Sequence, residues 1–380
     1  MFDATVFAAN LRTTRKGRQL SQAELAQLLF VSTQAVSKWE RGEAVPDIHH
    51  ICRLAQLFSI STDRLLGVQP TAEPALIAVD GGGTKTEFLL FTPTGEVKRR
   101  LVLPGANPNG AGLENSLRIL RQGIDALLQE GYGVQTVFIG CAGMASGGHG
   151  AAAEDALRKA YPQLKLQCRS DILNILSMAT DPGNAIAVIC GTGSVVYATC
   201  NGQLRRFGGG GWRLETVGSG YDMGRSALLA ALEHRDGTGM ATTLTGAIEQ
   251  RLGSTVWDAV GKLHSENTAF FADLAPLVLS AWQEGDTVAT AIAEATITRL
   301  AQLVNTAATH APNAVQVLLG GSLLTKSSAL RTALCLQLDP NLCAQSICMP
   351  PIWGACLRSA ALAKLPAPDP DTFIHSYKED

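Results

Sequence analysis

The stretch LIAVDGGGTKTEFLLF, residues 76–91, places a glycine-rich turn between two apolar runs. Residues 76–79 and 87–91 predict two β-strands, and the acid Asp80 opens the turn between them. Glycine carries no side chain, so backbone N–H groups at such a turn can approach phosphate oxygens closely. The stretch therefore predicts a hairpin whose tip binds phosphate. The candidate contacts are Gly81, Gly82, Gly83, Thr84 and Lys85.

The same order of elements recurs over residues 185–207: a strand, a glycine-rich loop, a second strand, the turn Asn201-Gly202 and a third strand. A single glycine-rich turn is more often structural than functional. Two in the same context, the first opened by an acid, indicate an internal duplication with two loops that grip a nucleotide triphosphate across a cleft. The candidate contacts in the second loop are Gly191, Thr192, Gly193 and Ser194.

Residues 1–67 carry a different pattern, in which apolar residues recur at helical spacing and breaks separate four or five short helices. Ser21 and Glu24 have the spacing of a capping box, in which each side chain bonds the backbone N–H of the other residue, so a helix should begin there. Ser32 can cap the next helix after a turn of about three residues, a connection typical of a DNA-binding helix-turn-helix. The segment therefore predicts a DNA-binding domain.

The second motif helix presents a polar face that would enter a major groove. On it Gln34, Ser37 and Lys38 lie at positions i, i+3 and i+4. Gln34 can bond a purine edge, whereas Lys38, Arg41 and Arg15 are better placed to meet phosphates. The alternative is that these side chains form only a solvated helix face. The candidate DNA contacts are Gln22, Thr33, Gln34, Ser37, Lys38 and Arg41.

The composition sets limits on both segments. Residues 1–68 hold 8 Lys/Arg against 6 Asp/Glu and the remainder 23 against 27, so the first segment is only mildly basic and its DNA-binding role rests on the motif. Nine cysteines without a C-x-x-C pair favour reduced thiols over a zinc or iron–sulfur site. No run approaches 18 apolar residues, so we expect no membrane span and a cytoplasmic location.

Residues 7–66 closely resemble the Cro/lambda-repressor-type domain of the XRE family, through Leu20-Ser21-Gln22, Glu24-Leu25-Ala26 and the run from Ala35 to Gly42. One departure is Phe30, where the family's turn usually has glycine because the backbone there favours positive φ. A bulky residue in that conformation costs about 1 kcal/mol, which weakens the turn without removing it. The resemblance implies binding to a double-stranded DNA operator and, because such sites are usually two-fold symmetric, a homodimer.

Residues 75 to about 366 resemble the sugar-kinase/Hsp70/actin ATPase superfamily, most closely its BadF/BcrA-type branch, which includes N-acetylglucosamine kinase. The resemblance rests on both glycine loops, on the motif 317–322 and on the turns 105–109 and 140–143. It implies an actin-like α/β ATPase body made of two RNase H-like halves. We assign residues 68–74 to a linker, 75–170 and 171–366 to the two halves, and 367–380 to a flexible tail.

The resemblance also implies roles for single residues. Asp80 would order the water shell of Mg²⁺, and Asp171 would be the base that accepts the proton of the sugar hydroxyl. For Asp171 the alternative is a simple cap of the helix that follows it. Asn107 and Gly143 would contact the sugar together with Asp171, and Gly320, Gly321 and Ser322 would contact the nucleoside of ATP.

One departure bears on catalysis. Where the family has a Gly-Asp-Glu-Gly stretch, this chain has residues 213–218, Arg-Leu-Glu-Thr-Val-Gly, which is two residues shorter. An acid expected to hold the sugar or organise the cleft is missing. Glu215 is the candidate substitute, but a two-residue deletion shifts the loop, and catalysis tolerates displacements of about 1 Å poorly.

The sequence thus predicts a cytoplasmic, sequence-specific transcription regulator whose body binds ATP and an amino sugar or related cell-wall sugar. Two alternatives remain for the body: an active sugar kinase or a catalytically inactive sensor. Intact Asp80, Asp171 and phosphate loops favour turnover, and the missing acid favours sensing. A further alternative is an ATPase that activates a CoA-ester reductase, although the cysteines show no arrangement suited to bridging an iron–sulfur cluster.

Overall fold

The computed structural model describes residues 3–58, 60–67, 72–214 and 218–379. The chain divides into two compact units: Met1–Pro74 with Glu130–Gly133, which we call the head, and Ala75–Gln129 with Val134–Asp380, which we call the body. Residues 68–71 of the predicted linker and residues 215–217 of the shortened stretch, Glu215 among them, lie outside the described residues.

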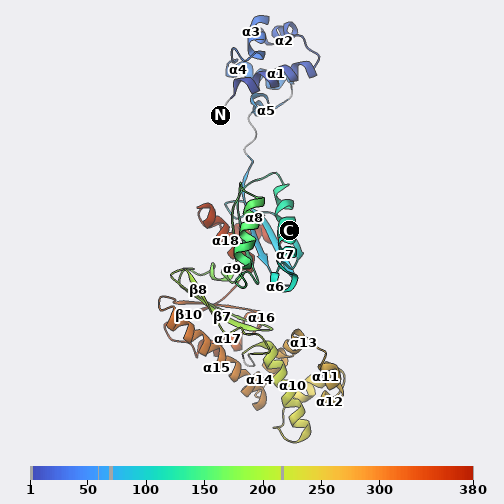
Figure 1. Cartoon of the computed structure of the whole chain (residues 1–380), viewed down its shortest axis with the longest axis vertical. Coiled ribbons are helices and arrows are strands. Elements are labelled where there is room, and N and C mark those ends of the chain that lie inside the picture. Colours follow the sequence, from blue (N-terminus) through green and yellow to red (C-terminus); the bar gives the residue numbers. More distant parts are fainter. Residues whose placement is uncertain (1–2, 59, 68–71, 215–217, 380) are drawn as a thin grey trace. The chain divides into compact units, whose positions relative to one another are not determined.

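The described part of the head consists of short helices around one apolar core (Figure 1). Phe7, Leu25 and Leu54, from three different helices, have no exposed surface. This confirms the prediction of an all-α head. In chain order the helices are α1 (Ala4–Gly17), α2 (Gln22–Leu29), α3 (Thr33–Glu40), α4 (Ile48–Phe58) and α5 (Thr62–Leu66).

Helices α2 and α3 begin where their predicted caps lie. Ser21 Oγ accepts a bond from Glu24 N at 3.1 Å, and Glu24 Oε2 accepts one from Ser21 N at 2.7 Å, which completes the capping box. Ser32 Oγ accepts a bond from Ala35 N at 3.1 Å. Between the two helices, Phe30 has a φ of 60°, the left-handed conformation expected at the family's glycine position. Its side chain is 84% exposed, so the strain there is not offset by burial.

Arg15 lies inside the head, which corrects the prediction that it meets DNA phosphate. Its Nε and Nη2 donate to the two oxygens of Glu40 at 2.6 and 2.9 Å, and both residues are 8% exposed. Gln22 Nε2 donates to the same carboxylate at 2.7 Å. The network joins α1, α2 and α3, and local sequence patterns do not reveal it because Arg15 and Glu40 are 25 residues apart.

The body contains two five-stranded sheets of the same topology (Figure 1). The strand order is β3-β2-β1-β4-β5 in the first sheet and β8-β7-β6-β9-β10 in the second, so each begins with an antiparallel meander and continues with parallel strands. This confirms an α/β body built from two similar halves. The strands are β1 (Pro74–Gly81), β2 (Lys85–Phe91), β3 (Val97–Pro104), β4 (Gly133–Cys141), β5 (Lys165–Arg169), β6 (Ala185–Cys190), β7 (Ser194–Cys200), β8 (Gln203–Phe207), β9 (Gln316–Gly320) and β10 (Cys343–Ser346).

Helices cover the sheets and connect their parallel strands. Met223 of α10, Val278 of α14 and Leu300 of α15 are fully buried in one cluster with Val188 of β6. None of the helices in the described ranges is both long and apolar enough to cross a membrane. The body helices are α6 (Pro108–Ala111), α7 (Leu113–Leu128), α8 (His149–Ala160), α9 (Ile172–Leu176), α10 (Gly220–Asp236), α11 (Leu244–Leu252), α12 (Val256–Leu263), α13 (Thr268–Ala272), α14 (Ala275–Gln283), α15 (Thr287–His310), α16 (Ser322–Lys326), α17 (Ser328–Cys335), α18 (Pro351–Ala363) and α19 (Pro370–Glu379).

The last two helices return to the first sheet, so the prediction of a flexible tail at 367–380 is wrong over Pro370–Glu379. Phe373 of α19 has no exposed surface and packs with Trp353 of α18, their ring centroids 4.8 Å apart. Ser376 Oγ accepts a bond from Val97 N at 2.9 Å, and Tyr377 donates to Glu87 at 2.8 Å. The second half is therefore not the continuous segment 171–366, because α18 packs on the first half. The proline and charge content of the segment predicts a frayed end. The segment is ordered instead because α19 packs on residues far away in the sequence.

We expect the Glu40→Ala variant to destabilise the head by about 3–5 kcal/mol, because it leaves the guanidinium of Arg15 buried without its partner. Amide hydrogen exchange of α1–α3 in the full chain measures the loss. Glu43→Ala is the matched control: it removes an exposed pair with Arg41, at 2.6 Å, and should cost much less stability, because exposed ion pairs are screened by solvent. Equal protection of the backbone amides from exchange in Glu40→Ala and Glu43→Ala would contradict the interpretation that the buried pair stabilises the head.

Replacing Phe373 by alanine should destabilise the body by about 3–5 kcal/mol, the usual cost of emptying a buried aromatic site. Asp371→Ala, an exposed change on the same helix, should leave stability within about 0.5 kcal/mol. Calorimetric unfolding of the full chain separates the two results. An unchanged transition in Phe373→Ala would mean that α19 does not hold the first sheet.

Candidate functional site

The first glycine loop is held by the hairpin of β1 and β2. Asp80 pairs in register with Glu87, and the turn closes with a bond from Gly82 N to Lys85 O at 2.9 Å. A Cβ on Gly81 would lie 2.6 Å from the Sγ of Cys141, so this position has room only for glycine. Beyond it Gly83, Thr84 and Lys85 are exposed at the tip.

The second loop lies against the predicted nucleoside loop. Gly191 N donates to Gly193 O at 2.9 Å, and a Cβ on Gly191 would lie 3.3 Å from the Oγ of Ser322. Gly321 has a φ of 87°, and a Cβ there would meet Cys190 O at 2.3 Å. The ends of β6 and β9 therefore come together because both loops have glycine at the contact.

One cavity of about 510 Å³, which we call the cleft cavity, unites part of the predicted site. Its walls are completed by apolar side chains that include Ile175, Tyr197 and Met349. The sequence-predicted residues that border it are Asp80, Gly81, Gly82, Asp171, Gly320, Gly321 and Ser322.

Both carboxyl groups of the cleft cavity hold protons more tightly than usual. The pKa of Asp80 is raised to about 6, chiefly by burial; a bond from Asn174 Nδ2 at 2.6 Å opposes the rise, and the nearby charge of Asp171 contributes to it. Burial also raises the pKa of Asp171, against bonds from Ser170 Oγ at 3.1 Å and Ile172 N at 3.0 Å. Asp171 thus caps α9 and faces the cavity at once. Two carboxyls with raised pKa values in one cleft are typical of a functional site.

Asn174 is a site residue that sequence reasoning missed. It is fully buried, binds Asp80, and its Oδ1 has no hydrogen-bond partner within the described part of the chain. A Cβ on Gly354 would meet Asn174 O at 1.6 Å, and one on Gly140 would meet Asn174 Oδ1 at 1.9 Å. The available signal was an amide in the otherwise apolar run 172–176.

The predicted sugar contacts Asn107 and Gly143 lie beside each other but do not border the cleft cavity. Asn107 Oδ1 accepts a bond from Asn109 N at 2.9 Å and caps α6, and a Cβ on Gly143 would lie 2.2 Å from that oxygen. The buried Thr86 Oγ accepts a bond from Ala106 N at 2.9 Å, which ties this segment to the first glycine loop.

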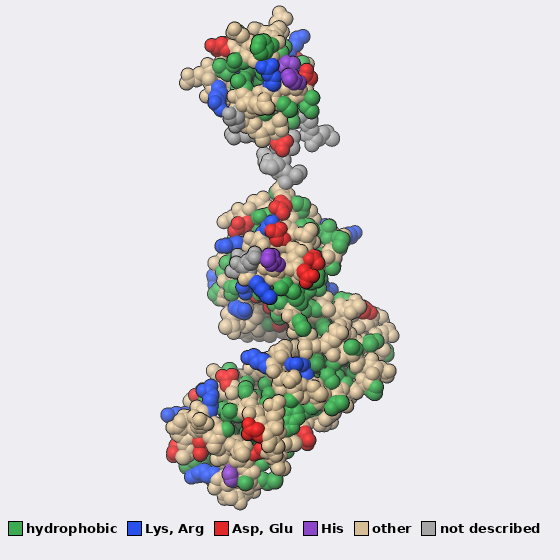
Figure 2. Space-filling model, turned by 180° about the vertical axis from the view of Figure 1, so that it is seen from behind, with side chains coloured by type: hydrophobic (Ala, Val, Ile, Leu, Met, Phe, Trp, Pro, Cys, Tyr) green, Lys and Arg blue, Asp and Glu red, His purple; other side chains and the backbone are tan. Residues whose placement is uncertain are grey.

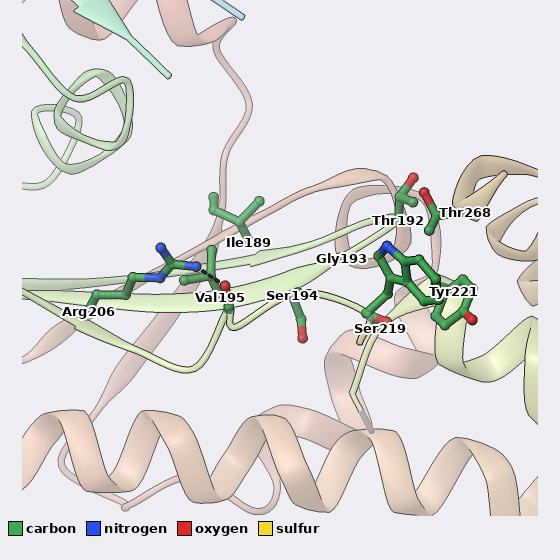
Figure 3. A pocket seen from close by; sticks show the side chains of 12 residues that line it. Ile189, Thr192, Gly193, Ser194, Val195, Arg206, Ser219, Tyr221 and Thr268 are labelled. Atoms are coloured by element: carbon green, nitrogen blue, oxygen red, sulfur yellow. Dashed lines mark hydrogen bonds between the residues drawn. The ribbon is translucent and has the colours of Figure 1, made fainter. Parts of the chain in front are cut away.

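Thr192, Gly193 and Ser194 border a second cavity of about 430 Å³, which we call the β8 cavity (Figure 3). It shares the walls Ile189 and Val195 with the cleft cavity. The two glycine loops therefore border adjacent cavities rather than a single one. Residues of this cavity that sequence reasoning did not assign are Arg206, Gly209, Gly211, Trp212, Ser219, Tyr221 and Thr268.

On the head, the predicted DNA-facing side chains are accessible with two exceptions. Thr33, Gln34, Lys38 and Arg41 are exposed, Ser37 is half-buried and bonds Arg41, and Gln22 is half-buried and bonds Glu40. On the face shown in Figure 2, the basic side chains of the head are dispersed among polar, apolar and acidic ones. A nucleic-acid interface here would depend on the few side chains of α3 rather than on a basic stripe.

Comparison with known proteins agrees with this architecture. Residues 77–353 match the model of the BadF/BadG/BcrA/BcrD ATPase family, and residues 11–65 match a helix-turn-helix model. The N-acetylmuramic acid/N-acetylglucosamine kinase of Clostridium acetobutylicum is 31% identical over 182 residues, 46% of this chain and 58% of that protein. The chain therefore matches less than two thirds of that relative's length.

Two further similarities cover the head and the whole fold. The HTH-type transcriptional activator BcrR of Enterococcus faecalis is 38% identical over 60 residues, 16% of this chain and 29% of that protein. A solved ROK family transcriptional regulator, a homologue of the Mlc protein of E. coli, has a TM-score of 0.52 at 13% identity over 99% of both chains, which is a likeness of fold alone. The chain belongs to the BadF/BadG/BcrA/BcrD ATPase family, with an XRE-type helix-turn-helix domain joined to a sugar-kinase-like body.

Proposed function

We propose that this protein is a transcription regulator that binds an operator through α3, and whose body binds Mg-ATP and an amino sugar and phosphorylates the sugar. The observation that carries the proposal is the convergence of Asp80, Asp171 and the loop 320–322 on one cavity of a sugar-kinase-like fold. The named relative from Clostridium supports an amino sugar as the acceptor.

The residues of the cleft fit a bound metal–nucleotide. Asp80 offers a carboxylate of which one oxygen is engaged by Asn174, and the backbone around Gly81 and Gly321 has no space for a side chain. Phosphate oxygens can therefore approach the backbone, as at other glycine-rich phosphate sites. Asp80, through water, would hold Mg²⁺, and the loops 81–85, 191–194 and 320–322 would hold ATP.

Phosphoryl transfer depends mainly on alignment and on charge neutralisation, which Mg²⁺ supplies when bound. Asp171 accepts the proton of the sugar hydroxyl, and its bonds from Ser170 and Ile172 hold the carboxylate in place. Asn107 and Gly143 bind the sugar beside the first loop. The raised pKa of Asp171 makes it a stronger proton acceptor than a solvated aspartate.

The head supplies the regulatory output in this proposal. Gln34 reads a purine edge, while Thr33, Ser37, Lys38, Arg41 and Gln22 position α3 in the groove. A homodimer would present two such heads to the two half-sites of an operator.

A catalytically inactive sensor is the second candidate. The observation that favours it is the stretch 213–218, which is two residues shorter than in the family and lacks an acid expected there. In this alternative ATP and sugar binding persist and turnover is absent.

A kinase assay on the purified chain with Mg²⁺, ATP and a panel of amino sugars decides between the two candidates. We expect sugar-dependent ATP consumption that Asp171→Asn lowers at least about 100-fold, the usual contribution of general base catalysis. Turnover should fall as the pH decreases through about 6, because Asp80 becomes protonated there and loses its attraction for the metal. Absence of turnover together with thermal stabilisation by ATP or sugar would establish the sensor.

Binding of the protein to its own upstream DNA checks the head. Gln34→Ala should cost about 1–3 kcal/mol and relax sequence preference, and Lys38→Ala should weaken binding to all sequences and reduce the salt slope by about 1. The double variant should abolish specific binding. Gln56→Ala, exposed on α4, is the control. Unchanged binding of the double variant would exclude α3 as the groove-binding helix.

A further inference from the structure

Asn174 lies behind Asp80 rather than in the cleft cavity. Its Nδ2 donates to Asp80 Oδ1 at 2.6 Å, whereas the described residues that border the cleft cavity include Asp80 and not Asn174. Asn174 has no exposed surface. A ligand in the cavity can therefore meet the carboxylate of Asp80 from one side while the amide of Asn174 holds it from the other. An effect of this amide on the ligand would have to pass through Asp80.

Glycines on two neighbouring elements hold the Asn174 side chain in place. A Cβ on Gly354 of α18 would meet Asn174 O at 1.6 Å, so α9 packs closely against the backbone of α18. A Cβ on Gly140, near the end of β4, would meet Asn174 Oδ1 at 1.9 Å. The amide thus fills the space that a side chain at Gly140 would take. Close packing leaves it little freedom to turn away from Asp80.

The fold itself gains little from an amide at this position. Asn174 interrupts the apolar run Ile-Leu-Asn-Ile-Leu of α9, and within the described part of the chain its Oδ1 accepts no hydrogen bond. A buried polar atom without a partner is destabilising, and leucine has a similar branched shape without one. Packing alone would therefore favour leucine. The bond to Asp80 is what the amide provides and leucine cannot.

The surroundings of Asp80 explain why a neutral donor suits this place. Burial raises the pKa of Asp80, and the bond from Asn174 has the next largest effect and lowers this pKa. The charges of Asp171 and Glu87 raise it. A lysine or arginine in place of Asn174 would also hold the carboxylate, but its positive charge would repel a metal ion. An amide orients the carboxylate and leaves its charge available to the metal.

Helix α9 connects this amide to the proposed base. Asp171 caps α9 through its bond from Ile172 N and borders the cleft cavity, and Asn174 follows within the same helix. The bond from Asn174 to Asp80 therefore ties the helix that carries Asp171 to the end of β1. Phosphoryl transfer requires the metal, the phosphate and the acceptor hydroxyl to be aligned, so a tie between these two carboxylates bears on catalysis.

We infer that Asn174 is the positioning residue of the metal–nucleotide site: its amide holds the carboxylate of Asp80 at a fixed place and orientation relative to Asp171. The inference rests on the proposed function, in which Asp80 holds Mg²⁺ through water, and adds to that site a residue that touches neither metal nor nucleotide. Loss of the amide should therefore weaken binding of the metal form of ATP and spare binding of ATP alone, which the glycine loops hold.

Titration of the full chain with Mn²⁺–ATP, and with ATP in the presence of a chelator, tests the inference. Asn174→Leu keeps the size of the side chain and removes the donor. It should weaken binding of Mn²⁺–ATP about tenfold or more, the usual effect of losing a hydrogen bond to a charged group, and leave binding of ATP alone unchanged. The electron paramagnetic resonance spectrum of the bound Mn²⁺ should also change. The metal-free variant should unfold at a temperature no lower than that of the parent chain, because removal of the unpartnered oxygen offsets the lost bond.

Two further variants locate the effect. Asn341→Leu removes another Asn–Asp bond, the exposed one of 2.9 Å from Asn341 Nδ2 to Asp339, and should leave both affinities intact. Asp80→Asn should weaken Mn²⁺–ATP binding directly. Addition of Asn174→Leu to Asp80→Asn should cause little further loss, because residues that act through one contact are not additive. In the kinase assay, Asn174→Leu should raise the Mg²⁺ concentration that gives half the maximal rate and leave KM for the sugar unchanged.

Unchanged Mn²⁺–ATP affinity in Asn174→Leu would overturn the inference and leave the proposed function in place. Equal weakening of both forms of ATP, with a lower unfolding temperature, would reduce Asn174 to a packing role and also overturn it, as would full additivity with Asp80→Asn. If Mn²⁺–ATP binding depends on Asn174 but the parent chain phosphorylates no amino sugar, the inference stands and the kinase proposal fails. If the parent chain binds neither form of ATP, the two fail together.

Discussion

The close approach of adjacent strand ends is the constraint on which the rest of the body depends. In the first sheet, Gly81 at the end of β1 touches Cys141 at the end of β4; in the second, Cys190 at the end of β6 touches Gly321 just after β9. A side chain in place of either glycine would push the strand ends apart. In each half a glycine therefore permits the contact, and in each half a loop with accessible backbone follows.

The position of these contacts explains why the polar groups gather there. Each sheet changes from its antiparallel meander to its parallel strands between β1 and β4, or between β6 and β9. A point at which the order of the strands in a sheet reverses leaves a crevice outside the carboxyl ends of the strands. Asp80 and the loop 320–322 lie at these ends and border the same cavity. The duplicated fold thus places an acid from one half beside a backbone loop from the other.

Charge is distributed unevenly between the two cavities. The cleft cavity holds Asp80 and Asp171, whose pKa values burial raises, whereas the β8 cavity holds Arg206. The apolar side chains of Ile189 and Val195 lie between them. Acidic and basic side chains therefore lie in neighbouring cavities. The head is built on a separate charge network, in which Glu40 accepts bonds from Arg15 and Gln22.

Features that depend on neighbours in the chain could be predicted from the sequence alone. They are both hairpins, the caps at Ser21 and Ser32, and the left-handed conformation at Phe30, and all of them are present in the structure. These depend on local hydrogen bonds and backbone sterics, which act over a few residues. Only the tertiary structure decided that Arg15 is buried, that α19 returns to the first sheet, and that Asn174 bonds Asp80 94 residues away. It also decided which glycines border which cavity. Each cavity is lined by segments far apart in the sequence, and the pattern of one segment does not indicate which other segment lies beside it.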